Sequence, residues 1–145
     1  MADATLVIER TFDATPENVF DAWIDPVQVA KWYGPEGFTN DIHEYCATPG
    51  GVYRLTMHSP DGEMHPLKGK FITVERPKKL VFTWQWEGDG GAEMNAETVV
   101  TVEFKAMGSK TEMTMTHERL AGEKSKQMHE QGWSSSFTKL EKILA

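Results

Sequence analysis

The sequence predicts an α+β protein in which a curved antiparallel sheet of seven strands wraps around one long C-terminal helix. Three observations support this class. Short segments of alternating apolar residues are separated by turn residues, two short helical segments follow the first of them, and a long segment with helical spacing comes last. Strands joined directly by turns pair antiparallel, because parallel strands need long crossovers, so the pattern excludes a doubly wound sheet.

The N-terminal part of the chain predicts one strand and two short helices. Residues 6–12 alternate with a period of two, which is typical of a strand with one face on a core. Thr15-Pro16 places an N-cap before a proline at the first helical position, and apolar residues then recur at helical spacing. Asp25-Pro26 ends this helix, and a second short helix over residues 27–32 ends at Gly34-Pro35.

From Phe38 onward, turn-forming residues divide the chain into six strand-length pieces. The expected turns lie at Pro49–Gly51, Ser59–Gly62, Pro77–Lys79, Gly88–Gly91 and Gly108–Ser109. The clearest strands are residues 80–86 and 98–104, where apolar side chains alternate regularly. Alternation is irregular over residues 64–74, which we interpret as a bulge near Gly69.

The last segment changes from strand alternation to helical spacing. We expect a helix over residues 123–144 whose buried stripe is His129, Trp133, Phe137, Leu140 and Leu144. This helix is the element long enough to cover the apolar face of the sheet. Gly132 within it costs about 1 kcal/mol relative to alanine, which predicts a close approach of the helix backbone to a neighbouring element.

Composition limits the classes of function. The 145 residues suit one domain spanning 1–145, and the net charge of −7 disfavours nucleic acid as a partner. The chain starts without a signal-peptide pattern and has no apolar run of membrane-spanning length, so we expect a cytoplasmic protein that does not span a membrane. Cys46 is the single cysteine, which excludes an intrachain disulfide and predicts a small buried side chain.

A sheet curved around one helix leaves an incompletely packed space at one end, and large apolar side chains directed there would line a cavity. The expected ligand-binding residues are Trp84, Trp86, Met113, Met115, His129, Trp133 and Phe137. Ordinary core packing is the competing interpretation for about half of them. A second aromatic cluster, Trp32, Tyr33 and Phe38, would either form a lid over the cavity or fasten the short helices to the sheet.

The sequence contains no motif that assigns catalysis, a metal or a cofactor. The five histidines form no HxxxH or HExxH pair, and no GxSxG motif or phosphate-binding glycine loop is present. We therefore expect no catalytic residue, no metal site and no cofactor. His129 lies one turn before Trp133 on the apolar helix face, where its imidazole would bond either a polar group of a ligand or a backbone carbonyl.

Several motifs, taken in order, resemble those of a known family. Residues 12–26, FDATPENVFDAWIDP, look like the opening of the START-like, birch-pollen-allergen-like (SRPBCC) superfamily. KWYGPEGF at 31–38 and HEQGW at 129–133, with the turns at 49–51 and 60–62, resemble the heat-shock protein 90 ATPase activator homologue-like branch. The resemblance covers essentially the whole chain and implies the helix-grip fold with a hydrophobic cavity.

The resemblance implies three classes of function. Members similar to this chain bind lipids, aromatic metabolites or polyketides, and this favours non-catalytic binding of an apolar, lipid-like or aromatic small molecule between sheet and C-terminal helix. Related branches are cyclases or hydrolases, which leaves an enzyme using His129 as acid or base as an alternative. The eukaryotic activators stimulate a chaperone ATPase, but they carry a further N-terminal domain that we expect this chain to lack. A chaperone partner or other protein-interaction role is therefore the less favoured alternative.

Overall fold

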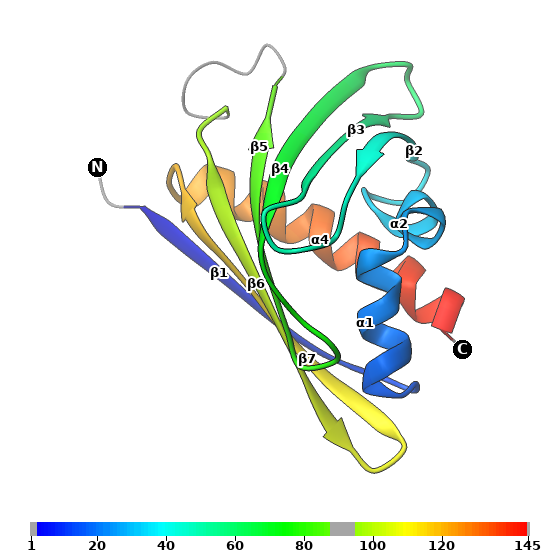
Figure 1. Cartoon of the computed structure of the whole chain (residues 1–145). Coiled ribbons are helices and arrows are strands. Elements are labelled where there is room, and N and C mark those ends of the chain that lie inside the picture. Colours follow the sequence, from blue (N-terminus) through cyan, green and yellow to red (C-terminus); the bar gives the residue numbers. More distant parts are fainter. Residues whose placement is uncertain (1–2, 88–94, 145) are drawn as a thin grey trace.

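The computed structural model describes residues 3–87 and 95–144 and confirms the predicted α+β helix-grip fold (Figure 1). The strands are β1 (Ala4–Phe12), β2 (Thr39–Tyr45), β3 (Val52–His58), β4 (Met64–Glu75), β5 (Lys79–Trp86), β6 (Thr98–Met107) and β7 (Lys110–Leu120). The helices are α1 (Pro16–Ile24), α2 (Pro26–Trp32) and α4 (Glu123–Leu144). The expected turn at Gly88–Gly91 lies outside the described residues. No helix in the described ranges is long and apolar enough to cross a membrane.

The strands form one antiparallel sheet with the order β1-β7-β6-β5-β4-β3-β2. Each strand from β2 to β7 pairs with the next one along the chain, and β1 pairs with β7 at one end of the sheet. The two edge strands are therefore β1 and β2. In β2 the register shifts between Ile42 and Glu44, so that His43 is an extra residue in the ladder.

The irregularity in β4 lies further along the strand than expected. The register between β4 and β5 shifts between Phe71 and Thr73, which places the bulge at Ile72 and not at Gly69. Gly69 has another role, because a Cβ atom there would overlap the carbonyl oxygen of Thr83 and lie 2.5 Å from the ring of Tyr53. The phenol of Tyr53 crosses this glycine and donates to that same carbonyl at 2.5 Å.

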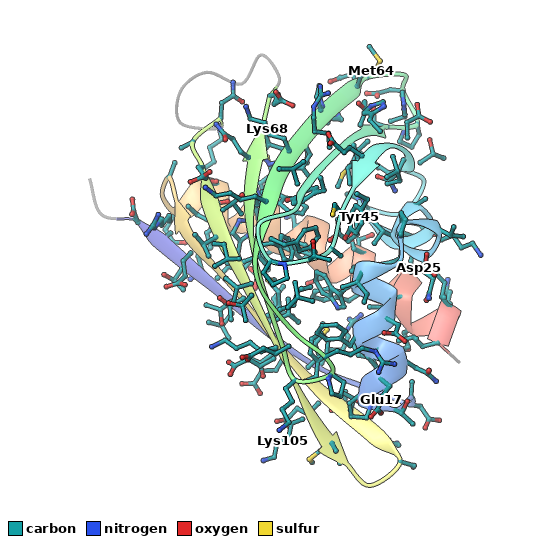
Figure 2. All side chains as sticks on the ribbon, in the orientation of Figure 1. Glu17, Asp25, Tyr45, Met64, Lys68 and Lys105 are labelled. Carbon is teal, nitrogen blue, oxygen red and sulfur yellow. The ribbon has the colours of Figure 1, made fainter. Side chains whose placement is uncertain are left out.

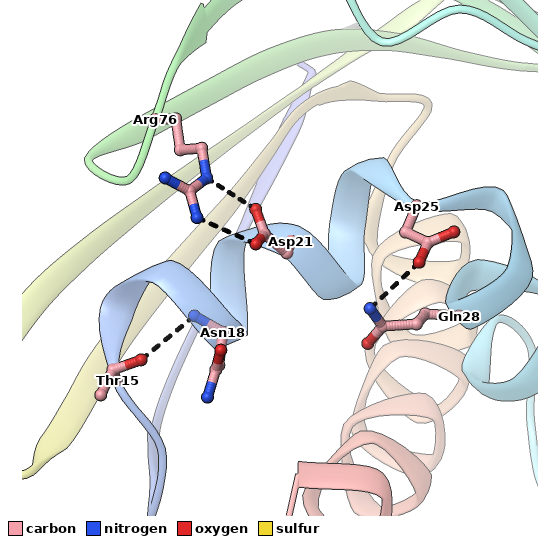
Figure 3. A network of polar contacts seen from close by, with 6 residues as sticks. All are labelled: Thr15, Asn18, Asp21, Asp25, Gln28 and Arg76. Carbon is pink, nitrogen blue, oxygen red and sulfur yellow. Dashed lines mark hydrogen bonds and ion pairs between the residues drawn. The ribbon is translucent and has the colours of Figure 1, made fainter.

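Side-chain caps define the two short helices (Figure 3). The hydroxyl of Thr15 accepts from the backbone N–H of Asn18 at 3.3 Å, and the carboxylate of Asp25, between the helices, caps α2. Arg76 at the β4–β5 turn binds both carboxylate oxygens of Asp21 at 2.8 and 3.0 Å. Helices α1 and α2 both contact α4 and lie beside its C-terminal end (Figure 1).

Helix α4 crosses the sheet and buries the stripe that its spacing predicts. His129, Trp133, Phe137 and Leu140 are buried, and Leu144 packs partly against the core. Trp23 of α1 lies at the centre of the aromatic core, with ring centroids 4.7 Å from Trp32 and 5.6 Å from Trp133. The core thus joins the short helices, α4 and the sheet into one cluster.

Two local expectations are wrong. Cys46 is exposed rather than buried, because it follows the end of β2 in a turn where the backbone of Gly51 packs against its carbonyl. Gly132 makes no close approach to another element, since a Cβ atom added there would meet nothing within 4 Å. That open space is part of the site described next.

Candidate functional site

A cavity of about 480 Å³ lies between α4, the β3–β4 hairpin, β5 and the loop that connects α2 to β2. Its lining residues are Gly34, Pro35, Phe38, Met57, Glu63, Met64, His65, Trp84, Trp86, Asn95, Met128, His129, Gly132, Trp133 and Ser136. Glu63, Met64 and Met128 are exposed and lie on its open side. Met64 stands at the outer end of β4 (Figure 2). The cavity therefore has a deep aromatic interior and a rim made by the hairpin and the helix.

Aromatic rings form the walls of the cavity. The rings of Trp84 and Trp133 lie 4.8 Å apart, and Trp86 stands perpendicular to Trp84 at 5.5 Å. At the rim, Phe38 stacks on His65 with ring centroids 6.0 Å apart. Rings in these arrangements offer large, rigid apolar surfaces to a bound molecule.

Behind Trp133 lies His117, a fully buried residue of β7. The indole N–H of Trp133 donates to Nδ1 of His117 at 3.1 Å, and Nε2 of His117 lies 2.7 Å from Oγ1 of Thr98. The Thr98 hydroxyl donates its proton to the carbonyl oxygen of Trp84 at 2.7 Å, so Nε2 of His117 must be the donor to Thr98. These bonds fix His117 as the neutral tautomer that is protonated at Nε2.

His129 is held in the opposite tautomer. Its Nδ1 lies 2.8 Å from the carbonyl oxygen of Ser125 and donates to it, whereas Nε2 accepts from the indole N–H of Trp86 at 3.1 Å. Of the two expected roles for His129, the bond to a backbone carbonyl is therefore the one observed. Both ring nitrogens are occupied, and this geometry does not support an acid or base role.

The two histidines face each other inside the protein. Their ring centroids are 5.0 Å apart. Burial lowers the pKa of His117 well below its usual value, and the neighbouring His129 lowers it further. Burial also lowers the pKa of His129, although the bond to the carbonyl of Ser125 opposes this shift. Both imidazoles are therefore neutral near pH 7.

The loop between α2 and β2 is fastened to α4 by polar contacts. The backbone N–H of Glu36 donates to Oγ of Ser135 at 2.8 Å. The ammonium group of Lys139 donates to the carbonyl oxygens of Tyr33 at 3.4 Å and Pro35 at 3.2 Å. Partial burial lowers the pKa of Lys139. These bonds hold one wall of the cavity against the helix.

The structure brings half of the expected site residues to the cavity. Trp84, Trp86, His129, Trp133 and Phe38 line it, whereas Met113, Met115, Phe137, Trp32 and Tyr33 pack in the core and do not. Met113 and Met115 share a face of β7 with His117 but lie further from the cavity end of that strand. Trp32 donates its N–H to the carbonyl oxygen of Ala22, and this contact fastens the short helices together.

Sequence reasoning missed the hairpin residues of the rim and the buried His117. His117 continues the two-residue period of Met113 and Met115, which could have identified it as inward-facing. Gly132 and Ser136 are three and seven residues after His129, so helical spacing could have found them too. No sequence signal places the β3–β4 hairpin over α4, because that depends on sheet curvature. Within residues 3–87 and 95–144, no group of three or more His, Cys, Asp or Glu could hold a metal ion.

Solved structures from bacteria share this architecture. A protein from Chromobacterium violaceum is similar with a TM-score of 0.88 and 23% identity, over 97% of this chain and 96% of its own. The AHSA1 protein from Silicibacter pomeroyi is 30% identical with a TM-score of 0.85, over 97% of both chains. A protein from Arthrobacter aurescens is 25% identical with a TM-score of 0.86, over 97% of this chain and 85% of its own.

The family comparison covers nearly the entire chain. No curated protein matches the sequence at a significant level. The profile of the family described as "Activator of Hsp90 ATPase homolog 1-like protein" matches residues 13–145. With the structural relatives, this match confirms the resemblance to the START-like superfamily, and the chain belongs to the Activator of Hsp90 ATPase homolog 1-like family.

Proposed function

We propose that this protein binds an apolar, lipid-like or aromatic small molecule, without converting it, in the cavity between the sheet and α4. The observation that carries the proposal is the aromatic cavity of about 480 Å³ walled by Trp84, Trp86 and Trp133. A space of this size lies within the range of small-molecule sites, roughly 300 to 1,000 Å³. The family fold, which commonly encloses apolar ligands, supports the same assignment.

The hydrogen bonds around the cavity favour binding over catalysis. Both nitrogens of His129 are engaged within the protein, and His117 is bonded on both sides as well. A general acid or base needs a free nitrogen within reach of its substrate. The cyclase or hydrolase alternative therefore lacks its proposed residue in this arrangement.

The proposal is tested by filling the cavity from Gly132. A side chain at this position points into open space on the cavity face of α4, so Gly132→Leu should occupy the site without strain. We expect this variant to lose binding of N-phenyl-1-naphthylamine, a neutral apolar fluorescent probe, while its free energy of unfolding is not lowered. Gly132→Ala is the matched control, and it should keep probe binding and gain about 1 kcal/mol of stability. Unchanged probe affinity in Gly132→Leu would place the probe elsewhere and refute the proposal.

Native mass spectrometry would identify the natural ligand class. Protein purified gently from its own source would be compared with its denatured mass. We expect a reproducible additional mass that is absent from Gly132→Leu prepared in parallel. An extra mass that persists in this variant would contradict binding in the cavity.

We further propose that residues 1–145 act as one domain in the cytoplasm. The single, exposed Cys46 is suited to a reducing compartment, and the net charge of −7 favours a small molecule over nucleic acid as the partner. The family name refers to activation of the Hsp90 ATPase. A chaperone-regulating role predicts a changed ATPase rate when this protein is added to purified Hsp90, whereas ligand binding alone predicts no change.

A further inference from the structure

We infer that His65 recognises a polar group of the ligand, and that this group is a hydroxyl at the end of the molecule that lies in the mouth of the cavity. The inference rests on the proposed function and narrows it. It adds one polar group to an otherwise apolar ligand and assigns a specificity-determining residue to the β3–β4 hairpin.

The side chain of His65 faces the cavity from β4. In the antiparallel register of β3 and β4, His65 lies directly opposite Met57, so the two side chains share one face of the sheet. Met57 is buried and lines the cavity, and His65 lines it as well. Their common face is therefore the one directed into the cavity.

Two aromatic neighbours hold the imidazole ring of His65 in place. Phe38 stacks on it with ring centroids 6.0 Å apart, and Trp86 meets it edge to face at 6.4 Å. Both neighbours line the cavity too. Ring packing thus fixes the imidazole in the cavity wall without using its nitrogens.

His65 differs from the other histidines in its hydrogen bonds. Bonds to side chains or to backbone engage His43, His58, His117 and His129. His65 makes none with the residues that the structure describes. Its ring is half-buried, yet neither nitrogen is among the fully enclosed polar atoms that lack a partner, so both nitrogens are accessible.

Accessible nitrogens in an apolar cavity wall favour a ligand that can pair with them. A molecule that fills the mouth of the cavity excludes water from the imidazole of His65. A purely apolar molecule would leave the nitrogens unpaired, which costs free energy, whereas a polar group at the right end would bond one of them.

A hydroxyl is the group that suits this position best. It both donates and accepts, so it can pair with an imidazole in either tautomer. Glu63 on the same rim would repel a carboxylate, and the described lining residues include no lysine or arginine. Further inside, His129 and Ser136 already bond within the protein. The hydroxyl therefore belongs at the mouth, with the apolar body of the ligand against the tryptophans.

The test compares thymol with p-cymene, two probes that differ by one hydroxyl group. Their dissociation constants are measured by displacement of N-phenyl-1-naphthylamine from the wild type and from His65→Phe, which keeps a ring beside Phe38 and removes both nitrogens. His58→Phe is the matched control, because His58 lies on the same hairpin but bonds Asp41 and does not line the cavity. The ratio of the two constants isolates the hydroxyl, since its dehydration is common to all variants.

We expect His65→Phe to shift this ratio about fivefold toward p-cymene, and His58→Phe to leave it unchanged. An unchanged ratio in His65→Phe would overturn the inference, and it would reduce His65 to a packing residue even if both probes bound more weakly. Failure of both probes to displace the dye from the wild type would also overturn it. The proposed function is decided separately, by binding of the dye itself, which has no hydroxyl, and by its loss in Gly132→Leu.

A measurement on the wild type keeps the inference testable if the variant does not fold. The ring nitrogens of the five histidines are followed in long-range ¹H–¹⁵N NMR spectra during titration with each probe. We expect thymol to shift a ring nitrogen of His65, as a new hydrogen bond does, and p-cymene to shift it much less. Equal shifts with both probes would contradict a bond between His65 and the hydroxyl.

Discussion

The indole N–H of Trp133 on α4 donates to Nδ1 of His117 on β7 at 3.1 Å, and this bond ties the central helix to the sheet behind the cavity. The same bond orients the indole ring that forms one cavity wall. Because His117 is also bonded to Thr98, the position of the ring depends on a chain of buried hydrogen bonds that reaches β6. Stability and the shape of the site are therefore coupled through one contact.

Removing the hydrogen bond between Trp133 and His117 should lower the free energy of unfolding. Trp133→Phe keeps an aromatic ring but leaves Nδ1 of His117 buried without a donor, and we expect a loss of about 1 to 3 kcal/mol in urea unfolding. Trp86→Phe is the control, because Trp86 is half-buried and its partner His129 lies nearer the open cavity. A smaller loss is expected there. Each change removes one indole–imidazole hydrogen bond, so equal losses in both variants would show that the deeper burial of His117 does not set the cost.

The two buried histidines predict a pH-dependent stability. Their pKa values are lowered in the folded protein, so below the unfolded value of about 6.5 the unfolded chain binds protons that the folded protein does not. The free energy of unfolding should therefore fall as the pH is lowered from about 7.5 to about 5.5, by up to about 1.4 kcal/mol per pH unit for each histidine. Urea unfolding at both pH values measures this slope.

A matched pair of variants assigns the slope to the buried rings. His117→Phe should reduce the dependence by the share that His117 contributes, whereas His43→Gln, at an exposed position of β2, should retain it in full. A slope that survives in His117→Phe at full size would assign it to other groups.

Gly69 should tolerate no side chain. In Gly69→Ala the new methyl group would overlap the carbonyl oxygen of Thr83 and press on the ring of Tyr53. Neither neighbour can yield easily, because one is backbone within the sheet and the other is hydrogen-bonded to it. We expect a loss of about 3 kcal/mol or more in thermal or urea unfolding. Gly132→Ala is the contrasting control, and similar effects of the two changes would contradict the packing described at both sites.

The contact between Ser135 and the cavity loop should control how often that loop opens. Ser135→Ala removes the acceptor of the Glu36 backbone N–H, so amide hydrogen exchange at Glu36 should become faster. Ser134→Ala, one residue earlier on the same helix, should leave this exchange rate unchanged. Faster exchange at Glu36 in both variants would point to a general loosening of α4 instead.

The sequence predicts the elements of this protein well and its cavity only in part. Periodicity locates α4 with the observed bounds and its buried stripe, because 3.6-residue spacing is a local property. It cannot distinguish core from cavity lining along one face. Phe137 and Trp133 share the stripe, yet only Trp133 lines the cavity, and Phe82 and Trp84 differ in the same way along β5. These distinctions depend on where the curved sheet separates from the helix, which is a long-range property.

Among the described residues, the strand order leaves the outer sides of β1 and β2 without a neighbouring strand. Such edges can recruit a strand from another molecule and start aggregation. Along β2 this is opposed by exposed Asp41, His43 and Glu44, and the extra residue at His43 interrupts the regular spacing that a joining strand would need. The bulge that distorts one edge of the sheet thereby works against strand pairing between two copies of the chain at β2.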